Sequence, residues 1–224
     1  EGYPACRSAH TGYLFGASPA LSTEFLRGRA HQLETMSADT LYLPYATSLR
    51  MSDLGYRNRN QAGVEVSVNA LDEYLKDLRH ATHTVHPPFA ALGVRVGDEY
   101  LQLNANVLQI DNEYYSTIRP KRVPQPGESQ SHALERDGVE YVEVRSLDLC
   151  VFEPVGACAD ELHFTEALLA QCLLRDSAPI GATEQQALEH NHLLVARRGR
   201  EPGLLLERDG RATPLREWAD ELLD

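Results

Sequence analysis

The chain has 224 residues, of which 42% are hydrophobic and 24% are charged, and its formal net charge is −12. This composition is typical of a folded globular protein and excludes disorder as the default state. The acidic balance also argues against nucleic acid as a partner, because sequence-independent binding to phosphates needs a basic surface.

No stretch approaches the roughly 18 consecutive apolar residues that a membrane span needs, and the start of the chain has no signal-peptide pattern. The four cysteines lack the spacing of zinc sites, and at this length they do not indicate a disulfide framework. We therefore expect a cytoplasmic protein with reduced thiols and no membrane partner.

The first predicted elements are a short helix and a strand. The helix begins at Ser18-Pro19, which have cap and first-turn chemistry, and ends before Gly28. Residues Leu41–Tyr45 suit a strand, and Pro44 places it at a sheet edge or marks its end. The segment Ser48–Gln61 is polar and is expected to be a loop.

A second helix is predicted after Asn69, which can act as its N-cap, and it closes near His80 and Pro87-Pro88. Its opposite face is charged, so we expect its apolar stripe to face a hydrophobic core. The stripe consists of Leu71, Tyr74, Leu75 and Leu78.

A β-hairpin is predicted next. Val94–Val96 and Tyr100–Leu103 flank Gly97-Asp98, and the alternation of side chains continues to Ile110, which indicates neighbouring antiparallel strands. The later segment Arg122–Ser131 is rich in Pro, Gly, Ser and Gln and is predicted to be a loop.

Three further helices are predicted towards the end of the chain. They are Asp160–Arg175, Thr183–Arg198, and a helix from Thr213-Pro214 onward. The second begins with a Thr-x-x-Gln capping box and stops at Gly199. Together, the helices and strands predict an α+β fold with mainly antiparallel strands.

The predicted strand Val139–Asp148 carries an acid and a base on one face. Because side chains alternate along a strand, Tyr141, Glu143 and Arg145 point to the same side. Burying such a pair is unfavourable unless a partner, a metal ion or a ligand matches it. Two interpretations stay open: a cross-strand salt bridge on an exposed face, or an active-site pair.

A cluster of cations lies in the segment Ile118–Arg122, directly after a run of acids and amides that ends at Tyr115. The cations are Arg119, Lys121 and Arg122. Such a cluster in a strongly acidic protein could hold a polyphosphate whose charge is shared with Mg²⁺. A solvated basic loop is the alternative interpretation.

A third candidate segment is Tyr42–Tyr56, which contains Arg50. The guanidinium of Arg50 could bind a carboxylate through two parallel hydrogen bonds, and Tyr56 could supply a phenol donor. Either residue could equally be a structural hydrogen-bonding group.

Four segments, in chain order, resemble successive blocks of bacterial-type glutamate–cysteine ligases. These segments are Tyr13–Pro19, Tyr42–Tyr56, Asn106–Arg122 and Glu140–Asp148. The blocks Leu43–Arg50 and Ile118–Arg122 are long enough to be specific, and the resemblance runs from about Tyr13 to Gly203.

The resemblance implies the glutamine-synthetase-like ligase fold, a curved and mainly antiparallel sheet with flanking helices. It also implies an ATP-dependent carbon–nitrogen ligase that joins the γ-carboxylate of L-glutamate to the amine of L-cysteine. The product, γ-glutamylcysteine, forms in the first step of glutathione biosynthesis through a γ-glutamyl phosphate. The implied cofactors are ATP, as a co-substrate, and Mg²⁺ or Mn²⁺, since both suit carboxylate ligands.

The same resemblance implies roles for individual residues. Glu143 matches a Mg²⁺ ligand, and Arg145 matches a catalytic residue that stabilises charge on the transferring phosphoryl group. Arg50 would bind a substrate carboxylate, while Tyr56 and Tyr115 would line the cysteine site. The nucleotide phosphates would meet the cationic residues, which are Arg119, Lys121 and Arg122.

The resemblance is also incomplete. Residues 1–12 are not similar to the family and stay unassigned, and residues 13–224 are expected to be the central part of the ligase catalytic domain. The N-terminal portion of the family, which carries a Glu-x-Glu pair and further metal ligands, has no counterpart, and the C-terminal helical region is shortened. Because Glu143 alone cannot complete an octahedral Mg²⁺ site, we expect the chain to be inactive by itself.

Two alternatives stay open on the sequence. The chain could come from another carboxylate–amine ligase of the same fold, because Tyr56 and Tyr115 do not identify a thiol substrate. It could also be a non-catalytic remnant that uses the fold for binding.

Overall fold

The protein is described by a computed structural model, which covers residues 33–37, 40–53, 64–148, 150 and 153–223. It divides into a central unit, within Arg57–Leu147, and a flanking unit, which combines residues up to Tyr56 with Asp148–Asp224. The described residues form helices and four two-stranded antiparallel sheets, which confirms the predicted α+β class. No helix in these ranges is both long and apolar enough to cross a membrane.

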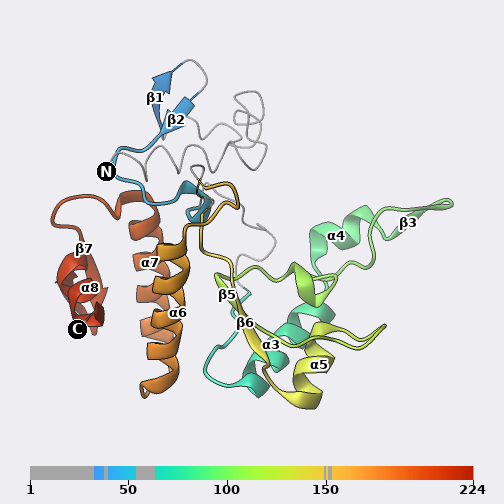
Figure 1. Cartoon of the computed structure of the whole chain (residues 1–224). Coiled ribbons are helices and arrows are strands. Elements are labelled where there is room, and N and C mark those ends of the chain that lie inside the picture. The colour runs from blue at the N-terminus through green and yellow to red at the C-terminus, as the bar shows by residue number, and fades with distance from the viewer. Residues whose placement is uncertain (1–32, 38–39, 54–63, 149, 151–152, 224) are drawn as a thin grey trace. The chain divides into compact units, whose positions relative to one another are not determined.

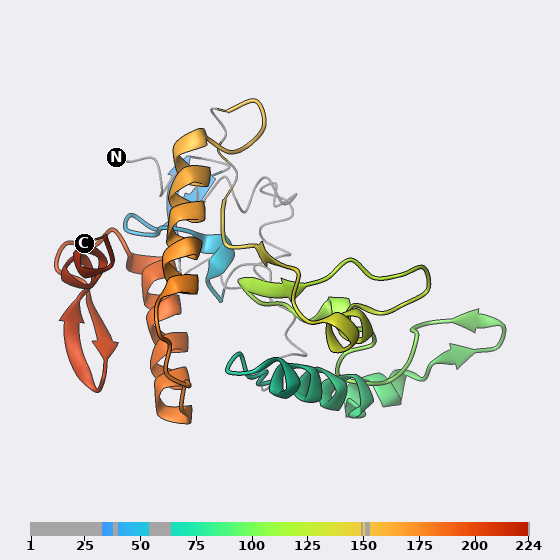
Figure 2. The ribbon, with the colours of Figure 1, turned by 60° about the horizontal axis from the view of Figure 1, so that its bottom comes forward.

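The central unit consists of helices that lie against a pair of strands. Its elements are α3 (Leu71–His83), α4 (Pro87–Leu92), β3 (Arg95–Val96), β4 (Glu99–Tyr100), the 3₁₀ helix η4 (Asp111–Glu113), β5 (Ile118–Lys121), α5 (Gln130–Asp137) and β6 (Tyr141–Val144). Helices α3 and α5 lie side by side next to β5 and β6, and the β3–β4 hairpin projects from this group (Figures 1 and 2). The core therefore forms where α3 and α5 meet.

Helix α3 buries the predicted apolar stripe. Its residues join Leu108 and Leu134 in one core cluster, in which Leu108 is 0% and Leu134 is 1% exposed. The predicted cap at Asn69 is wrong, because α3 begins after Ala70 and has no side-chain cap. Acidic side chains of α3 instead hold the preceding segment: Asp77 Oδ2 accepts a hydrogen bond from Ser67 N at 2.9 Å.

The segment after α3 differs from the prediction in two places. Pro87 and Pro88 begin α4 instead of only ending the previous helix, which fits the preference of proline for the first helical turn. The predicted β3–β4 hairpin is confirmed, but the strand pattern does not continue to Ile110. There, the side chain of Asn104 donates to Gln109 O at 3.0 Å, and such local bonds compete with strand pairing.

Helix α5 lies partly inside the segment that was predicted to be a loop. Ser129 is its N-cap, and the Ser129 hydroxyl accepts a hydrogen bond from His132 N at 3.3 Å. Gly138 follows the helix with φ 76°, a conformation that favours glycine. A serine and a glycine thus bracket the helix, and together they are a signal for it that the composition of the segment obscures.

The flanking unit contains the remaining elements. They are β1 (Glu34–Ser37), β2 (Thr40–Tyr42), the 3₁₀ helix η2 (Leu49–Met51), α6 (Ala159–Leu174), α7 (Ala182–Arg198), β7 (Leu205–Arg208), β8 (Arg211–Pro214) and α8 (Leu215–Leu223). The strand predicted over Leu41–Tyr45 is found as β2, but it covers only Thr40–Tyr42 and ends before Pro44, which agrees with Pro44 marking the end of a strand. The predicted helix from Ser18-Pro19 lies outside the described residues, as does the end of the predicted loop Ser48–Gln61.

The predicted helices near the C-terminus are confirmed as α6, α7 and α8. The capping box of α7 is wrong, because the N-cap is Gly181 and no side chain caps the helix. The β7–β8 hairpin, beside which α8 packs (Figure 2), was not predicted. Its turn residues Asp209 and Gly210 have φ values of 52° and 71°. Asp-Gly is a strong signal for such a tight hairpin turn.

A buried asparagine joins α7 to this hairpin. The amide nitrogen of Asn191 donates to Glu207 O at 2.6 Å, and its oxygen accepts from Glu207 N at 2.9 Å. The side chain, which is in a residue only 5% exposed, therefore pairs with both backbone groups of one strand residue.

Candidate functional site

The candidate site is built on one face of the β5–β6 pair. In the antiparallel register, Arg119 lies opposite Glu143, and Lys121 lies opposite Tyr141. Residues directly opposite each other in an antiparallel pair project to the same face, and so do residues two positions apart. The sheet therefore gathers Arg119, Lys121 and Glu143 on one face, although they come from two separate sequence segments.

Glu143 has one carboxylate oxygen in an unusual environment. The Nζ atom of Lys121 lies 3.7 Å from Glu143 Oε2, which is an ion pair by distance. The Oε2 atom is nonetheless buried and has no hydrogen-bond partner, even though the side chain as a whole is 42% exposed. The Lys121 ammonium is too far away to donate a hydrogen bond, so the acceptor is costly to bury unless a donor or a metal ion reaches it. This oxygen is thus suited to bind a cation.

Arg119 is turned into the central unit. It is only 6% exposed, and its guanidinium donates to the carbonyl oxygens of Asp111, at 3.4 Å, and Asn112, at 3.5 Å. Burial raises the pKa of the neighbouring Tyr74 hydroxyl, and the charge and hydrogen bond of Arg119 act in the opposite direction. Arg119 therefore holds η4 against β5.

The structure brings together Arg145 and Tyr115, which were predicted from different segments. Arg145 N donates to Thr117 O at 2.8 Å, so the pairing of the two strands continues past the end of β6. The guanidinium carbon of Arg145 lies 5.2 Å from the centroid of the Tyr115 ring, a cation–π geometry. By alternation, Arg145 follows Glu143 on the same side of the strand.

Arg122, by contrast, does not join this face. It follows Lys121 directly, so the alternation places it on the opposite side, where its Nε donates to Gly138 O at 2.6 Å. Its Nη1 lies 4.0 Å from both Asp137 Oδ2 and Glu140 Oε2. Arg122 thus binds the residues that connect α5 to β6.

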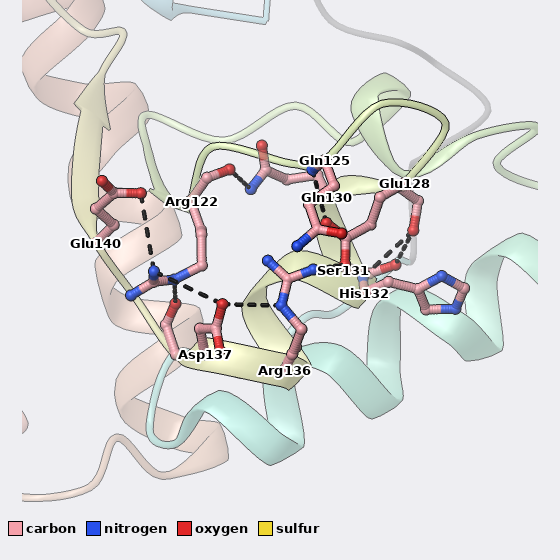
Figure 3. Close-up of polar contacts among 11 residues, drawn as sticks. Arg122, Gln125, Glu128, Gln130, Ser131, His132, Arg136, Asp137 and Glu140 are labelled. Atoms are coloured by element: carbon pink, nitrogen blue, oxygen red, sulfur yellow. Dashed lines mark hydrogen bonds and ion pairs between the residues drawn. The ribbon is translucent and has the colours of Figure 1, made fainter.

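The contacts of Arg122 extend into a polar network that fixes the loop before α5 (Figure 3). Arg136 pairs with Glu128 and also with Asp137, at 2.8 Å. The N–H of Gln125 donates to Glu128 Oε2 at 2.8 Å. This backbone bond and the neighbouring Arg136 guanidinium lower the pKa of Glu128. The network was not predicted, because its members are close only once α5 has formed.

One predicted site residue, Arg50, belongs to the described part of the flanking unit. Arg50 is the middle residue of η2, and its side chain lies outside the description, as does Tyr56. Among the described residues, no three or more His, Cys, Asp or Glu side chains gather where they could hold a metal ion. Glu143 therefore does not belong to such a group within these ranges.

The family and the relatives to which this chain is similar in sequence are all glutamate–cysteine ligases. A sequence model of the family described as Glutamate-cysteine ligase matches residues 8–195. The glutamate–cysteine ligase of Janthinobacterium sp. (strain Marseille) is 51% identical over 212 residues, and that of Azotobacter vinelandii is 54% identical over 212 residues. Each match covers 95% of this chain but 40% of the relative. The chain thus spans about 40% of the length of these curated relatives.

A solved structure supports the likeness in three dimensions. The glutamate–cysteine ligase of Francisella tularensis, solved in complex with AMP, is 39% identical with a TM-score of 0.80. The match covers 86% of this chain and 39% of that one. The similarity therefore extends to the fold and is not confined to short motifs.

Proposed function

Because the chain belongs to the glutamate–cysteine ligase family, we propose that it forms part of an enzyme that joins glutamate to cysteine with cleavage of ATP. The reaction would form the amide between the γ-carboxylate of glutamate and the amine of cysteine, through a γ-glutamyl phosphate, as the first step of glutathione biosynthesis. The observation that carries the proposal is the family match over residues 8–195. Residues 13–224 are proposed as the central part of the catalytic domain.

The proposed metal ligand is Glu143. Its buried Oε2 atom has no hydrogen-bond partner, which supports a metal ion as a further partner beside the Lys121 ammonium. Mg²⁺, or Mn²⁺, prefers carboxylate oxygens and, when bound, supplies positive charge to phosphate oxygens. Lys121, 3.7 Å away, partly neutralises the carboxylate. Mg²⁺ usually keeps several water ligands, and these would supply part of an octahedral coordination shell.

The proposed catalytic residue is Arg145, which would stabilise negative charge on the transferring phosphoryl group. Its contact with Tyr115 supports a shared site, because Tyr115 is proposed to line the cysteine pocket. Arg50 and Tyr56 are proposed to bind substrate carboxylates on the strength of the family blocks in which they lie.

The three residues proposed to meet the ATP phosphates differ in the support they have. Lys121 has the strongest support, because it shares a face with Glu143. Among the described contacts, its Nζ atom makes no hydrogen bond to a backbone oxygen. Arg119 is buried and bonds to carbonyl oxygens, and Arg122 lies on the other face. ATP use itself is supported by the AMP bound to the Francisella tularensis ligase. A cytoplasmic location fits such a reaction.

The test is a chimaera in which this chain replaces the matching segment of the Janthinobacterium ligase. We expect phosphate release that requires ATP, glutamate and cysteine, and we expect none from the chain alone. Release with another amine but not with cysteine would favour a different carboxylate–amine ligase of this fold. An inactive chimaera, beside an active parent ligase, would favour a non-catalytic remnant.

A further inference from the structure

The segment that carries Arg50 is attached to the end of α7. Here "the Arg50 segment" denotes residues 44–53, and "the α7 platform" denotes residues 192–200, the last turns of α7 and the residues just after it. Both lie in the flanking unit. The two are far apart in sequence: Thr47 and Val195, which are in contact, are separated by 148 positions.

Backbone groups at the end of α7 provide the main attachment. The last carbonyl oxygens of a helix have no partner within the helix. The Ala196 oxygen accepts hydrogen bonds from both Thr47 N and Ser48 N, each at 3.1 Å. The Thr47 hydroxyl donates to the Val195 oxygen at 2.6 Å. The helix end thus receives three donors from the Arg50 segment.

Side chains of the platform hold the segment on either side of Thr47. His192 Nε2 lies 2.9 Å from Met51 O, so this nitrogen must carry the proton. Arg197 Nε lies 3.0 Å from Asp53 Oδ1, which makes an ion pair. The backbone N–H of Arg200 donates to Tyr45 O at 3.0 Å. The platform therefore contacts the segment from Tyr45 to Asp53.

Gly199 lets the two parts approach each other closely. A Cβ atom at this position would lie 2.6 Å from Thr47 Cγ2 and 2.6 Å from Val195 O, closer than real Cβ contacts. The backbone of Gly199 has φ −59°, which any residue can adopt. Glycine is therefore favoured at this position because it leaves space for the Thr47 side chain, and not because of its backbone conformation.

We propose that the α7 platform positions Arg50 for its substrate, with Thr47, His192 and Gly199 as positioning residues. The backbone of Arg50 is held on both sides, because Ser48 N and Met51 O, two and one positions away, bond to the platform. The inference rests on the proposed function for the role of Arg50, but the attachment itself stands on the contacts alone.

The attachment is tested on the chain itself by hydrogen exchange, followed by mass spectrometry of peptides covering residues 45–53. Gly199→Ala and Thr47→Val should speed exchange in these peptides by roughly three- to tenfold, as expected for the loss of one or two hydrogen bonds. Thr47→Ser keeps the hydroxyl and should change little. Gly181→Ala is the matched control at the other end of α7, where a Cβ meets nothing within 4 Å.

A rescue separates a positioning role from a general loss of structure. Thr47→Ser removes the Cγ2 atom that the new Cβ of Gly199→Ala would meet, so the double variant should recover part of the protection. Recovery is partial, because the contact with Val195 O stays. Unchanged exchange in Gly199→Ala and Thr47→Val would overturn the inference. So would an equal loss of protection in β7 and β8.

The functional part is tested in the chimaera described above. Gly199→Ala and Thr47→Val should raise KM for one amino-acid substrate several-fold and change kcat less, as Arg50→Lys should. If only Arg50→Lys raises KM, the inference is wrong and the role of Arg50 stands. If Arg50→Lys leaves both KM values unchanged, the role of Arg50 is wrong, and the exchange result alone then decides whether the platform holds the segment.

Discussion

The guanidinium of Arg145 lies over the ring of Tyr115, with its central carbon 5.2 Å from the ring centroid. Cation–π contacts of this kind contribute about 0.5–2 kcal/mol, and the contribution increases as the contact is shielded from solvent. Tyr115 belongs to the segment before β5, and Arg145 follows the last residue of β6. The contact therefore joins the residues just before β5 to those just after β6. It brings the proposed phosphoryl-stabilising residue, Arg145, next to Tyr115, which is proposed to line the cysteine site.

Replacing Tyr115 tests this contact directly. In the isotope-labelled chain, the Nε–H resonance of Arg145 should show a ring-current shift that Tyr115→Phe retains and Tyr115→Leu abolishes. Phe keeps the ring face, whereas Leu offers neither a ring current nor a negative face to the cation. An unchanged resonance in Tyr115→Leu would show that the ring does not lie beneath the guanidinium in solution.

Acidification should release the loop held by Glu128. Its pKa is lowered, first by the Gln125 N–H and then by Arg136, so the folded state binds the proton less tightly than the unfolded state. The stabilisation is therefore fully present above the ordinary glutamate pKa of 4.5 and is lost as the pH falls through the lower folded-state pKa. The Gln125 amide resonance, followed against pH, should report this midpoint.

Two variants control that titration. Glu128→Gln should remove the transition from the Gln125 amide, because no carboxyl group is left to titrate. Arg136→Leu should move the midpoint upwards, since it removes a cation that favours the carboxylate. A midpoint at or above 4.5 in the unaltered chain would contradict the structure.

Truncating the core of the central unit should destabilise it strongly. Leu134 is 1% exposed and lies in the cluster with Leu75 and Leu78, so Leu134→Ala should cost about 2–5 kcal/mol. The measurement is hydrogen exchange of α3 amides at increasing urea concentration. Leu103→Ala removes the same atoms from a residue that is 70% exposed, and it should change stability by less than about 0.5 kcal/mol.

Asn191→Leu should weaken the attachment of the β7–β8 hairpin to α7. It leaves two backbone groups of Glu207 without their partner, which costs about 1–3 kcal/mol. Trp218, the single tryptophan, lies in α8 beside this hairpin and reports its unfolding by fluorescence. Gln186→Leu on the exposed side of α7 is the control. Equal transitions in both variants would rule out a special role for Asn191.

The part of the candidate site that the sequence predicted well is the part that depends on local geometry. A strand repeats every two residues, so Glu143 and Arg145 could be placed on one face without any knowledge of the rest of the chain. The same rule, applied to β5, separates Lys121 from Arg122, whereas proximity in sequence alone makes the cations look like one group. The division of the cations between two faces of the strand could therefore have been predicted from the sequence.

Other features had local signals that composition concealed. Helix α5 has a capping serine and a terminal glycine, and the β7–β8 hairpin has an Asp-Gly turn. The attachment of Thr47 to Ala196 had no such signal. It depends on a helix end whose carbonyl oxygens are satisfied by residues far away in the chain, and no periodicity in the sequence encodes such a pairing.

Asn191 has a consequence for how the hairpin meets other molecules. A tight two-residue turn between Arg208 and Arg211 leaves the N–H and C=O of Glu207 pointing away from β8, towards the open side of β7. Open strand edges invite another strand to add itself, which is a common route to aggregation. Because the amide of Asn191 binds both groups and α7 packs against β7, a strand that approaches this edge cannot pair with Glu207, which lowers the tendency of the hairpin to aggregate.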